Sequence, residues 1–172
     1  MVGLATRRWI SPPRSETNHS QALDTAVRFL ARRPRSEYEV WQRLRRAGTD
    51  VAVIETVLAQ LRRHRLVDDQ AFAEYWVDQR QTFRPRGARL LRAELAQRGI
   101  ARGGAEAATA PLEETAEEDA YRAASKRAAR LAAGDEAEFT RRLGQWLARR
   151  GFGWDTITPV VARLWAERSS AA

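Results

Sequence analysis

The chain has 172 residues, which is enough for one ordinary domain or for a short array of smaller units. Its 44% of hydrophobic and 30% of charged residues are typical of a folded protein, and the lack of cysteine excludes disulfides, thiolate metal sites and cysteine catalysis. No apolar run approaches the roughly 20 residues that a membrane span needs. Residues 1–20 also lack the apolar stretch of a signal peptide, so a cytoplasmic location is expected.

Positive charge is concentrated in one part of the chain. The net charge is +8, and every basic residue except Lys126 is an arginine. Residues 1–100 hold 19 basic and 11 acidic residues, whereas residues 101–172 hold 11 of each. This asymmetry predicts a polyanionic or acidic partner for the N-terminal part, although a GC-rich genome would also produce an arginine-rich surface.

Residues 1–20 show no helical periodicity and are expected to form a flexible basic tail. Three short helices are then predicted in residues 21–67. Pro34 ends the first, and Ser36 and Glu39 form a capping box at the start of the second. Gly48 ends the second helix, and Asp50 is placed to cap the third. The predicted buried faces contain Leu23, Ala26, Val27 and Leu30, then Val40, Trp41, Leu44 and Ala47, then Ile54, Val57, Leu58 and Leu61.

A pentapeptide at the end of the second helix recurs twice. The three copies are Leu44-Arg-Arg-Ala-Gly48, Leu95-Ala-Gln-Arg-Gly99 and Leu147-Ala-Arg-Arg-Gly151. Apolar residues keep the same offsets around them: Val40, Leu91 and Leu143 before each copy, and the pairs Ile54 and Ile157, Val57 and Val160, Leu58 and Val161, and Leu61 and Leu164 after the first and third copies. Repeats this short bury their apolar faces by stacking on their neighbours. We therefore predict an all-α fold of three tandem three-helix units, at residues 21–67, 68–112 and 113–172.

The second and third units are less regular than the first. Gly103, Gly104 and Pro111 limit the third helix of the second unit to a short, alanine-lined segment. The acidic residues from Glu113 to Asp119 form either a linker or the acidic first turn of the next helix. Pro159 is expected in the first turn of the last helix, where a missing N–H is tolerated.

Two segments resemble the signature motifs of the RecX family. The first is Leu61–Glu74, which ends in Leu66-Val-Asp-Asp-Gln-Ala-Phe-Ala-Glu74, and the second is Arg86–Leu95 followed by Arg98-Gly99-Ile100. Ala22 to Arg33, with Ser36-Glu37 and Leu44 to Gly48, is similar to the first repeat of the family. The resemblance covers about residues 22–167. Arg65 stands where the family commonly has a glycine, and the acidic, alanine-rich segment 105–119 is atypical.

The resemblance implies an elongated, curved array of three-helix repeats that carries no catalysis, cofactor or metal. Such a protein binds the RecA nucleoprotein filament and inhibits its extension and its ATPase, strand-exchange and coprotease activities, in homologous recombination and the SOS response. A monomer without a membrane partner is expected. The candidate contacts to the filament, or to DNA phosphates, are nine arginines: Arg45, Arg46, Arg62, Arg63, Arg65, Arg84, Arg86, Arg89 and Arg92.

Other conspicuous residues have simpler interpretations, and one alternative function stays open. Asp68 and Asp69 are expected to cap a helix, and Trp41, Trp76, Trp146 and Trp165 are expected to pack in the core. The alternative is a non-specific, basic, helical DNA-binding protein, because Ala47 to Asp50 has the outline of a helix–turn–helix. The helix that would enter the major groove begins Val51-Ala-Val-Ile-Glu-Thr56, which offers few donors to base edges and disfavours specific recognition. A helical scaffold for an unrelated protein fits the architecture but not the motifs.

Overall fold

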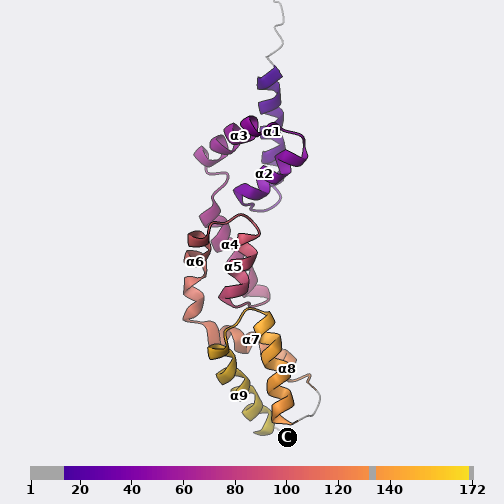
Figure 1. Cartoon of the computed structure of the whole chain (residues 1–172), viewed down its shortest axis with the longest axis vertical. Helices are drawn as coiled ribbons and strands as arrows, with labels where there is room; N and C mark the ends of the chain where they lie inside the picture. Colours follow the sequence, from indigo (N-terminus) through magenta and orange to yellow (C-terminus); the bar gives the residue numbers. More distant parts are fainter. Residues whose placement is uncertain (1–13, 132–134, 171–172) are drawn as a thin grey trace, which may run out of the picture. The chain divides into compact units, whose positions relative to one another are not determined.

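The computed structural model describes residues 14–131 and 135–170, and it divides at Val67 into two compact units. Over these residues the fold contains nine α-helices, one short 3₁₀ helix and no strand (Figure 1). The predicted all-α class is therefore confirmed. None of the described helices is long and apolar enough to cross a membrane.

The first unit is a bundle of three helices: α1 (Arg14–Leu30), α2 (Glu37–Arg46) and α3 (Val51–Arg63). Both predicted caps of this unit are present. The Glu39 amide donates to the Ser36 hydroxyl and the Ser36 amide donates to the Glu39 carboxylate, while the Ala52 amide donates to Asp50. The bundle encloses one core, made of Ala22, Ala26, Val40, Leu44, Ile54, Val57, Leu58, Leu61 and Val67.

The first helix begins earlier than the sequence predicts. It starts at Arg14, so residues 14–20 are helical where we expected a flexible tail, and only residues 1–13 of that predicted tail lie outside the described part. The segment 14–21 contains no apolar residue. Periodicity therefore has nothing to detect there, because it registers only a helix that buries one face.

The second compact unit, which begins at Asp68, contains both the second and the third three-helix repeat. It has six α-helices around two cores. The elements are α4 (Asp69–Phe83), α5 (Ala88–Ala96), α6 (Arg102–Thr109), η1 (Ala110–Glu113), α7 (Ala116–Ala128), α8 (Glu136–Arg149) and α9 (Trp154–Ser170). The core of α4–α6 is built on Phe72, Trp76, Leu91 and Leu95, with small residues from α6. The core of α7–α9 is built on Phe139, Leu143, Leu147, Ile157, Val160, Val161 and Leu164.

The internal repeat is confirmed at the level of single atoms. Leu44, Leu95 and Leu147 are each 0% exposed, at the same place in each three-helix unit. The glycine that ends each pentapeptide has a positive φ, of 81°, 80° and 89° in chain order. In each copy the carbonyl of the leucine accepts the amide of the residue after the glycine, as in a Schellman cap.

The short third helix of the second repeat is confirmed, whereas the position of Pro159 in the last helix differs from the prediction. Helix α6 is short, with Ala105, Ala108 and Thr109 buried. Glu117, Glu118 and Asp119 form the acidic first turn of α7, while Glu113 and Glu114 precede that helix. Pro159 lies in the second turn of α9, not the first, because the helix already begins at Trp154. The Ile157 amide donates to the Gly153 carbonyl, so the helix begins directly after Gly153.

Candidate functional site

Two of the predicted partner-binding arginines lie at the end of α2. Arg45 and Arg46 are both exposed. The Arg46 guanidinium donates to the Gln42 side chain at 3.2 Å, and that of Arg45 lies 5.9 Å from the centroid of the Trp41 ring. A guanidinium has five N–H donors, so these contacts leave most of them available to a partner.

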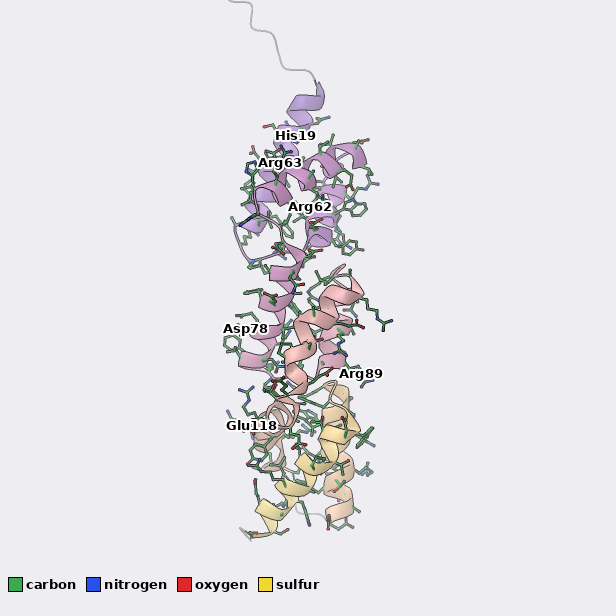
Figure 2. The ribbon with its side chains drawn as sticks, turned by 90° about the vertical axis from the view of Figure 1, so that its left-hand side faces the viewer. His19, Arg62, Arg63, Asp78, Arg89 and Glu118 are labelled. Carbon is green, nitrogen blue, oxygen red and sulfur yellow. The ribbon has the colours of Figure 1, made fainter. Side chains whose placement is uncertain are left out.

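Three more predicted arginines lie around the end of α3 (Figure 2 labels Arg62 and Arg63). Arg62 Nε donates to both carboxylate oxygens of Glu37, at 2.8 and 2.9 Å, and so ties α3 to the start of α2. Arg63 and Arg65 are exposed, and neither forms an ion pair with a described residue. Arg62 therefore has a structural role, while Arg63 and Arg65 present their charge to solvent.

A basic hollow in the first unit was missed by the sequence analysis. Arg28, Arg32 and Arg43 line a cavity of about 500 Å³ together with Thr25 and Phe29, and no carboxylate lines it. Arg28 lies in the last turn of α1 and Arg32 in the turn that follows it, and their i, i+4 spacing was the available signal. The first unit thus has more exposed positive charge than the five selected arginines.

The four predicted arginines of the second unit do not form a single patch. Arg84 and Arg89 are exposed, whereas Arg86 and Arg92 are half-buried. Arg92 donates to the Thr109 hydroxyl at 2.7 Å and to Glu113 at 3.1 Å, so it holds α5 against the end of α6. Arg92 therefore has a structural role.

Glu94 on α5 pairs with Arg86, which the sequence predicted as a partner contact, and with Arg80, which it did not. One carboxylate oxygen accepts Trp76 Nε1 at 2.9 Å and Arg80 Nε at 3.2 Å, and the other is paired with Arg86. The Arg98 guanidinium donates to the Glu94 main-chain carbonyl at 2.9 Å. Arg80 and Arg98 also lie 3.9 and 3.5 Å from the centroid of the Trp76 ring, a cation–π arrangement. Arg86 is consequently a component of this network.

Positive charge around Arg86 exceeds negative charge. Burial lowers the pKa of the Arg86 guanidinium, and repulsion from Arg80, Arg150, Arg84 and Arg98 lowers it further. Burial and repulsion from Arg84 likewise lower the pKa of the Arg150 guanidinium. The ordinary pKa of an arginine side chain is so high that both groups stay protonated near neutral pH. The surroundings of Arg86 therefore contain several cations that repel one another.

Main-chain contacts join the second and third repeats next to Arg86. The Gly87 amide donates to the Arg150 carbonyl at 2.9 Å, and the Arg150 guanidinium donates back to the Pro85 carbonyl at 2.8 Å. The Arg89 guanidinium donates to the Ala148 carbonyl at 3.0 Å. The junction thus uses charged side chains to bind main-chain oxygens across the repeats.

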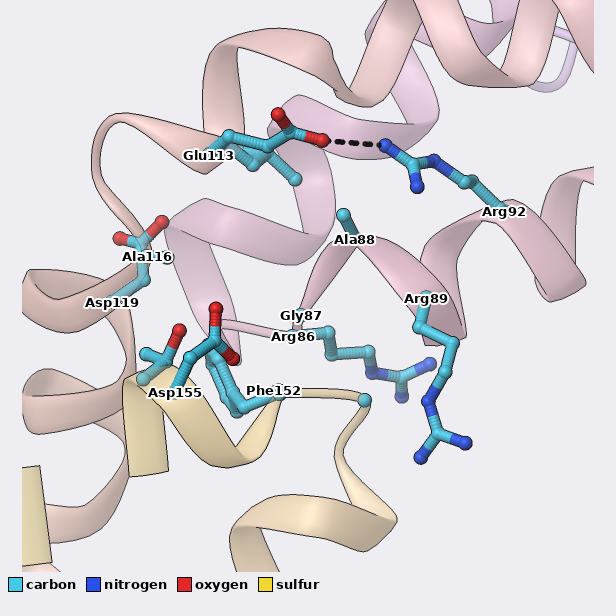
Figure 3. Close-up of a pocket in the computed structure, with 14 residues that line it drawn as sticks. Arg86, Gly87, Ala88, Arg89, Arg92, Glu113, Ala116, Asp119, Phe152 and Asp155 are labelled. Atoms are coloured by element: carbon cyan, nitrogen blue, oxygen red, sulfur yellow. Dashed lines mark hydrogen bonds and ion pairs between the residues drawn. The ribbon is translucent and has the colours of Figure 1, made fainter. Parts of the chain in front are cut away.

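A cavity of about 450 Å³ opens next to the junction, at the N-terminal end of α5 (Figure 3). Figure 3 shows arginines on one side of it and carboxylates on the other: Arg86, Arg89 and Arg92 against Glu113, Asp119 and Asp155. Asp119 is buried and paired with Arg122 at 2.6 Å. Because the two walls have opposite charge, the cavity itself does not select an anion.

Three family models match the chain in order. They describe the first, second and third three-helix domains of RecX, and they match residues 22–61, 68–108 and 114–161. The chain belongs to the RecX family.

Curated relatives support the assignment at the sequence level. Each of the following is named Regulatory protein RecX. The protein of Chlorobium limicola is 31% identical over 87% of this chain and 93% of the relative, and that of Amycolatopsis mediterranei is 37% identical over 82% of this chain and 80% of the relative. The protein of Geobacillus thermodenitrificans is 35% identical, and this chain spans only 53% of its length.

Solved RecX structures share the fold. The crystal structure of RecX from Lactobacillus salivarius superposes with a TM-score of 0.79 at 23% identity, covering 87% of this chain and 97% of the other. A second crystal structure, described as regulatory protein RecX, gives a TM-score of 0.78 at 21% identity over 91% and 82% of the two chains. At these identities the likeness concerns the fold alone.

The residues that carry the RecX resemblance mainly specify this fold. Asp68 accepts the amides of Gln70 and Ala71 and so caps α4, as expected. Phe72 and Leu95 are core residues. Gly87 lies at the junction of the repeats and Glu94 holds the arginine network. The motifs therefore identify the RecX family without marking the surface that meets a partner.

Proposed function

We propose that this RecX protein is a non-enzymatic regulator that binds the RecA nucleoprotein filament and inhibits its extension and its ATPase, strand-exchange and coprotease activities. The observation that carries the proposal is the match of all three RecX three-helix domains along one chain. The curated relatives are named regulatory proteins, which agrees with a role in control. The protein would act as a cytoplasmic monomer in recombination and the SOS response.

The same proposal assigns the three repeats to residues 21–67, 68–112 and 113–172 and the attraction to the nine selected arginines. Seven of these arginines are exposed, although Arg62 and Arg89 among them also form bonds within the fold. The two half-buried ones, Arg86 and Arg92, contribute by holding the second repeat together. Arginines beside an acidic protein surface or bound DNA raise the rate of encounter and fix the orientation of the complex. Arg28, Arg32 and Arg43 add to the same charge.

Specific DNA recognition is less well supported by the exposed residues of α3. Its first two turns present Val51, Ala52, Glu55 and Thr56 to solvent. Of these side chains only the threonine has a hydrogen-bond donor, and arginine, lysine, asparagine and glutamine are the usual partners of base edges. Contact of α3 with DNA would thus be limited to phosphates, and the experiment below separates such contact from binding to the filament.

The proposal is tested with RecA assembled on single-stranded DNA. Addition of the full chain should lower the steady-state ATPase rate and slow filament extension, and the chain should co-sediment with filaments. Bare single-stranded DNA at the same nucleotide concentration is the control. Absence of co-sedimentation, or an unchanged ATPase rate, would contradict the proposal, and a raised rate would make the protein an activator. Equal affinity for bare DNA and filament would favour the DNA-binding alternative.

A further inference from the structure

Helix α4 ends in a large, exposed aromatic side chain. Phe83 is 74% exposed, the highest fraction among the exposed large hydrophobic residues of the described chain. It is the last residue of α4, one turn after Arg80 and directly before Arg84. Single exposed apolar side chains are common on protein surfaces, so Phe83 is informative only through its surroundings.

Arginine surrounds the end of α4. Arg80 and Arg86 both pair with Glu94, whose side chain is only 12% exposed, and Arg98 donates to the carbonyl of the same glutamate. The Arg150 guanidinium binds the carbonyl of Pro85, the residue between Arg84 and Arg86. We call this the Phe83 corner, and it consists of Phe83, Arg80, Arg84, Arg86, Arg98 and Arg150. Arg80 and Arg86 share the single carboxylate of Glu94.

The clustered cations of the Phe83 corner favour the binding of an additional carboxylate. Partly buried like charges repel one another, so a carboxylate that enters among them is stabilised more than it would be beside a single solvated arginine. Most of the guanidinium groups are already held, by Trp76, by Glu94 or by the Pro85 carbonyl. Little side-chain entropy would be lost on binding, because these rotamers are fixed beforehand.

We infer that the Phe83 corner docks an acidic segment of the filament protein, with Phe83 inserted into an apolar pocket of that protein and carboxylates paired with Arg84 and its neighbours. This inference rests on the proposed function and deepens it by naming the contact. Aromatic and arginine side chains at the centre of an interface are the types that most often dominate binding energy.

The arrangement favours a protein partner over nucleic acid. Proteins that follow a nucleic-acid backbone spread their cations along a groove, because phosphates recur along the strand. Here Arg80 and Arg86 share Glu94, and Arg84 and Arg150 lie beside them. Such convergence suits one or two carboxylates, which an arginine fork binds in a planar, bidentate manner.

The test compares Phe83→Ala and Arg84→Glu with two matched controls in the full chain. Arg141→Glu reverses an exposed arginine on α8, and Leu66→Ala truncates a residue that is 51% exposed. The dissociation constant is measured by anisotropy of the labelled chain titrated with RecA filaments on single-stranded DNA. Circular dichroism checks that each variant is folded. Phe83→Ala and Arg84→Glu should each weaken binding by about 10-fold or more, while the controls stay within about 2-fold.

Three outcomes separate this inference from the proposed function. If the unmodified chain binds filaments and both Phe83 corner variants bind equally well, the docking inference is wrong and the proposed function stands. If the unmodified chain does not bind filaments, the proposed function itself is wrong. If the variants lose affinity for bare single-stranded DNA by the same factor as for filaments, the corner contacts nucleic acid and the docking inference is overturned.

Discussion

Gly87 and Gly151 meet main chain to main chain, at a distance that leaves no room for a side chain. A Cβ atom on Gly87 would lie 2.1 Å from the Gly151 carbonyl oxygen, and a Cβ on Gly151 would lie 2.5 Å from the Leu90 Cβ. The amide of Gly87 donates to Arg150 across the same contact. Two glycines from different repeats are therefore needed for the second and third repeats to pack this closely.

We accordingly expect Gly87→Ala to destabilise the second unit by about 2–4 kcal/mol, because the new methyl group collides with main-chain atoms that have no free rotamer. Gly103→Ala is the matched control. Nothing lies within 4 Å of its added Cβ, and alanine should stabilise α6 by about 0.5–1 kcal/mol. Urea unfolding followed by circular dichroism measures both changes. Equal stability of the two variants would show that the junction can open without cost.

The sequence predicted the helices, the repeat and most of the core because these depend on local periodicity and caps. Leu44, Leu95 and Leu147 were matched by spacing alone. The roles of the arginines were predicted less well, because the sequence does not show which carboxylate each arginine pairs with in the fold. Glu94 is 14 residues from Arg80 and eight from Arg86, and the contact appears only when α4 packs on α5. The Gly87–Gly151 contact likewise depends on tertiary packing.

The three pentapeptide leucines should have similar energetic weight. Leu44→Ala, Leu95→Ala and Leu147→Ala should each cost about 2–5 kcal/mol, because each removes a fully buried side chain and leaves a cavity. The first variant should affect the first unit and the other two the second unit, as reported by hydrogen exchange of each segment. Leu66→Ala, at an exposed position, should change stability by about 0.5 kcal/mol or less. A cost below about 1 kcal/mol at one of the three would break the equivalence of the repeats.

Arg65 is a site at which this RecX protein is strained. Its φ is 54°, the only positive value among the described non-glycine residues, and the Leu66 amide donates to the Leu61 carbonyl as in the glycine caps. Arg65→Gly should stabilise the first unit by about 0.5–1 kcal/mol, since the left-handed strain exceeds the entropy cost of glycine. Arg63→Gly, in the last turn of α3, should instead destabilise it by about 1 kcal/mol. If urea unfolding shows the Arg65→Gly variant to be less stable than the unmodified chain, the proposed backbone strain at Arg65 is wrong.

Charge on the first unit is predicted to drive filament binding, and the structure shows which arginines give a clean test. Arg62 pairs with Glu37 and Arg92 with Glu113, so changing them would disturb the fold as well as the surface. Replacing Arg45, Arg46, Arg63 and Arg65 together by glutamine removes four exposed charges instead. Helicity and melting temperature should change little, because exposed charges contribute little to stability. Binding to RecA filaments at low salt should weaken by about 10-fold or more, with a shallower salt dependence.

The control for this experiment removes the same number of charges from the third repeat. Lys126, Arg130, Arg141 and Arg149 are exposed, and two of them lie in the last turn of a helix, against three in the test set. Both quadruple variants have the same net charge, so a long-range effect of net charge would weaken binding equally in the two. Only a contact through the first unit would make the test variant weaker than the control at every salt concentration. Equal loss in both variants would assign the attraction to net charge and remove the role proposed for these four arginines.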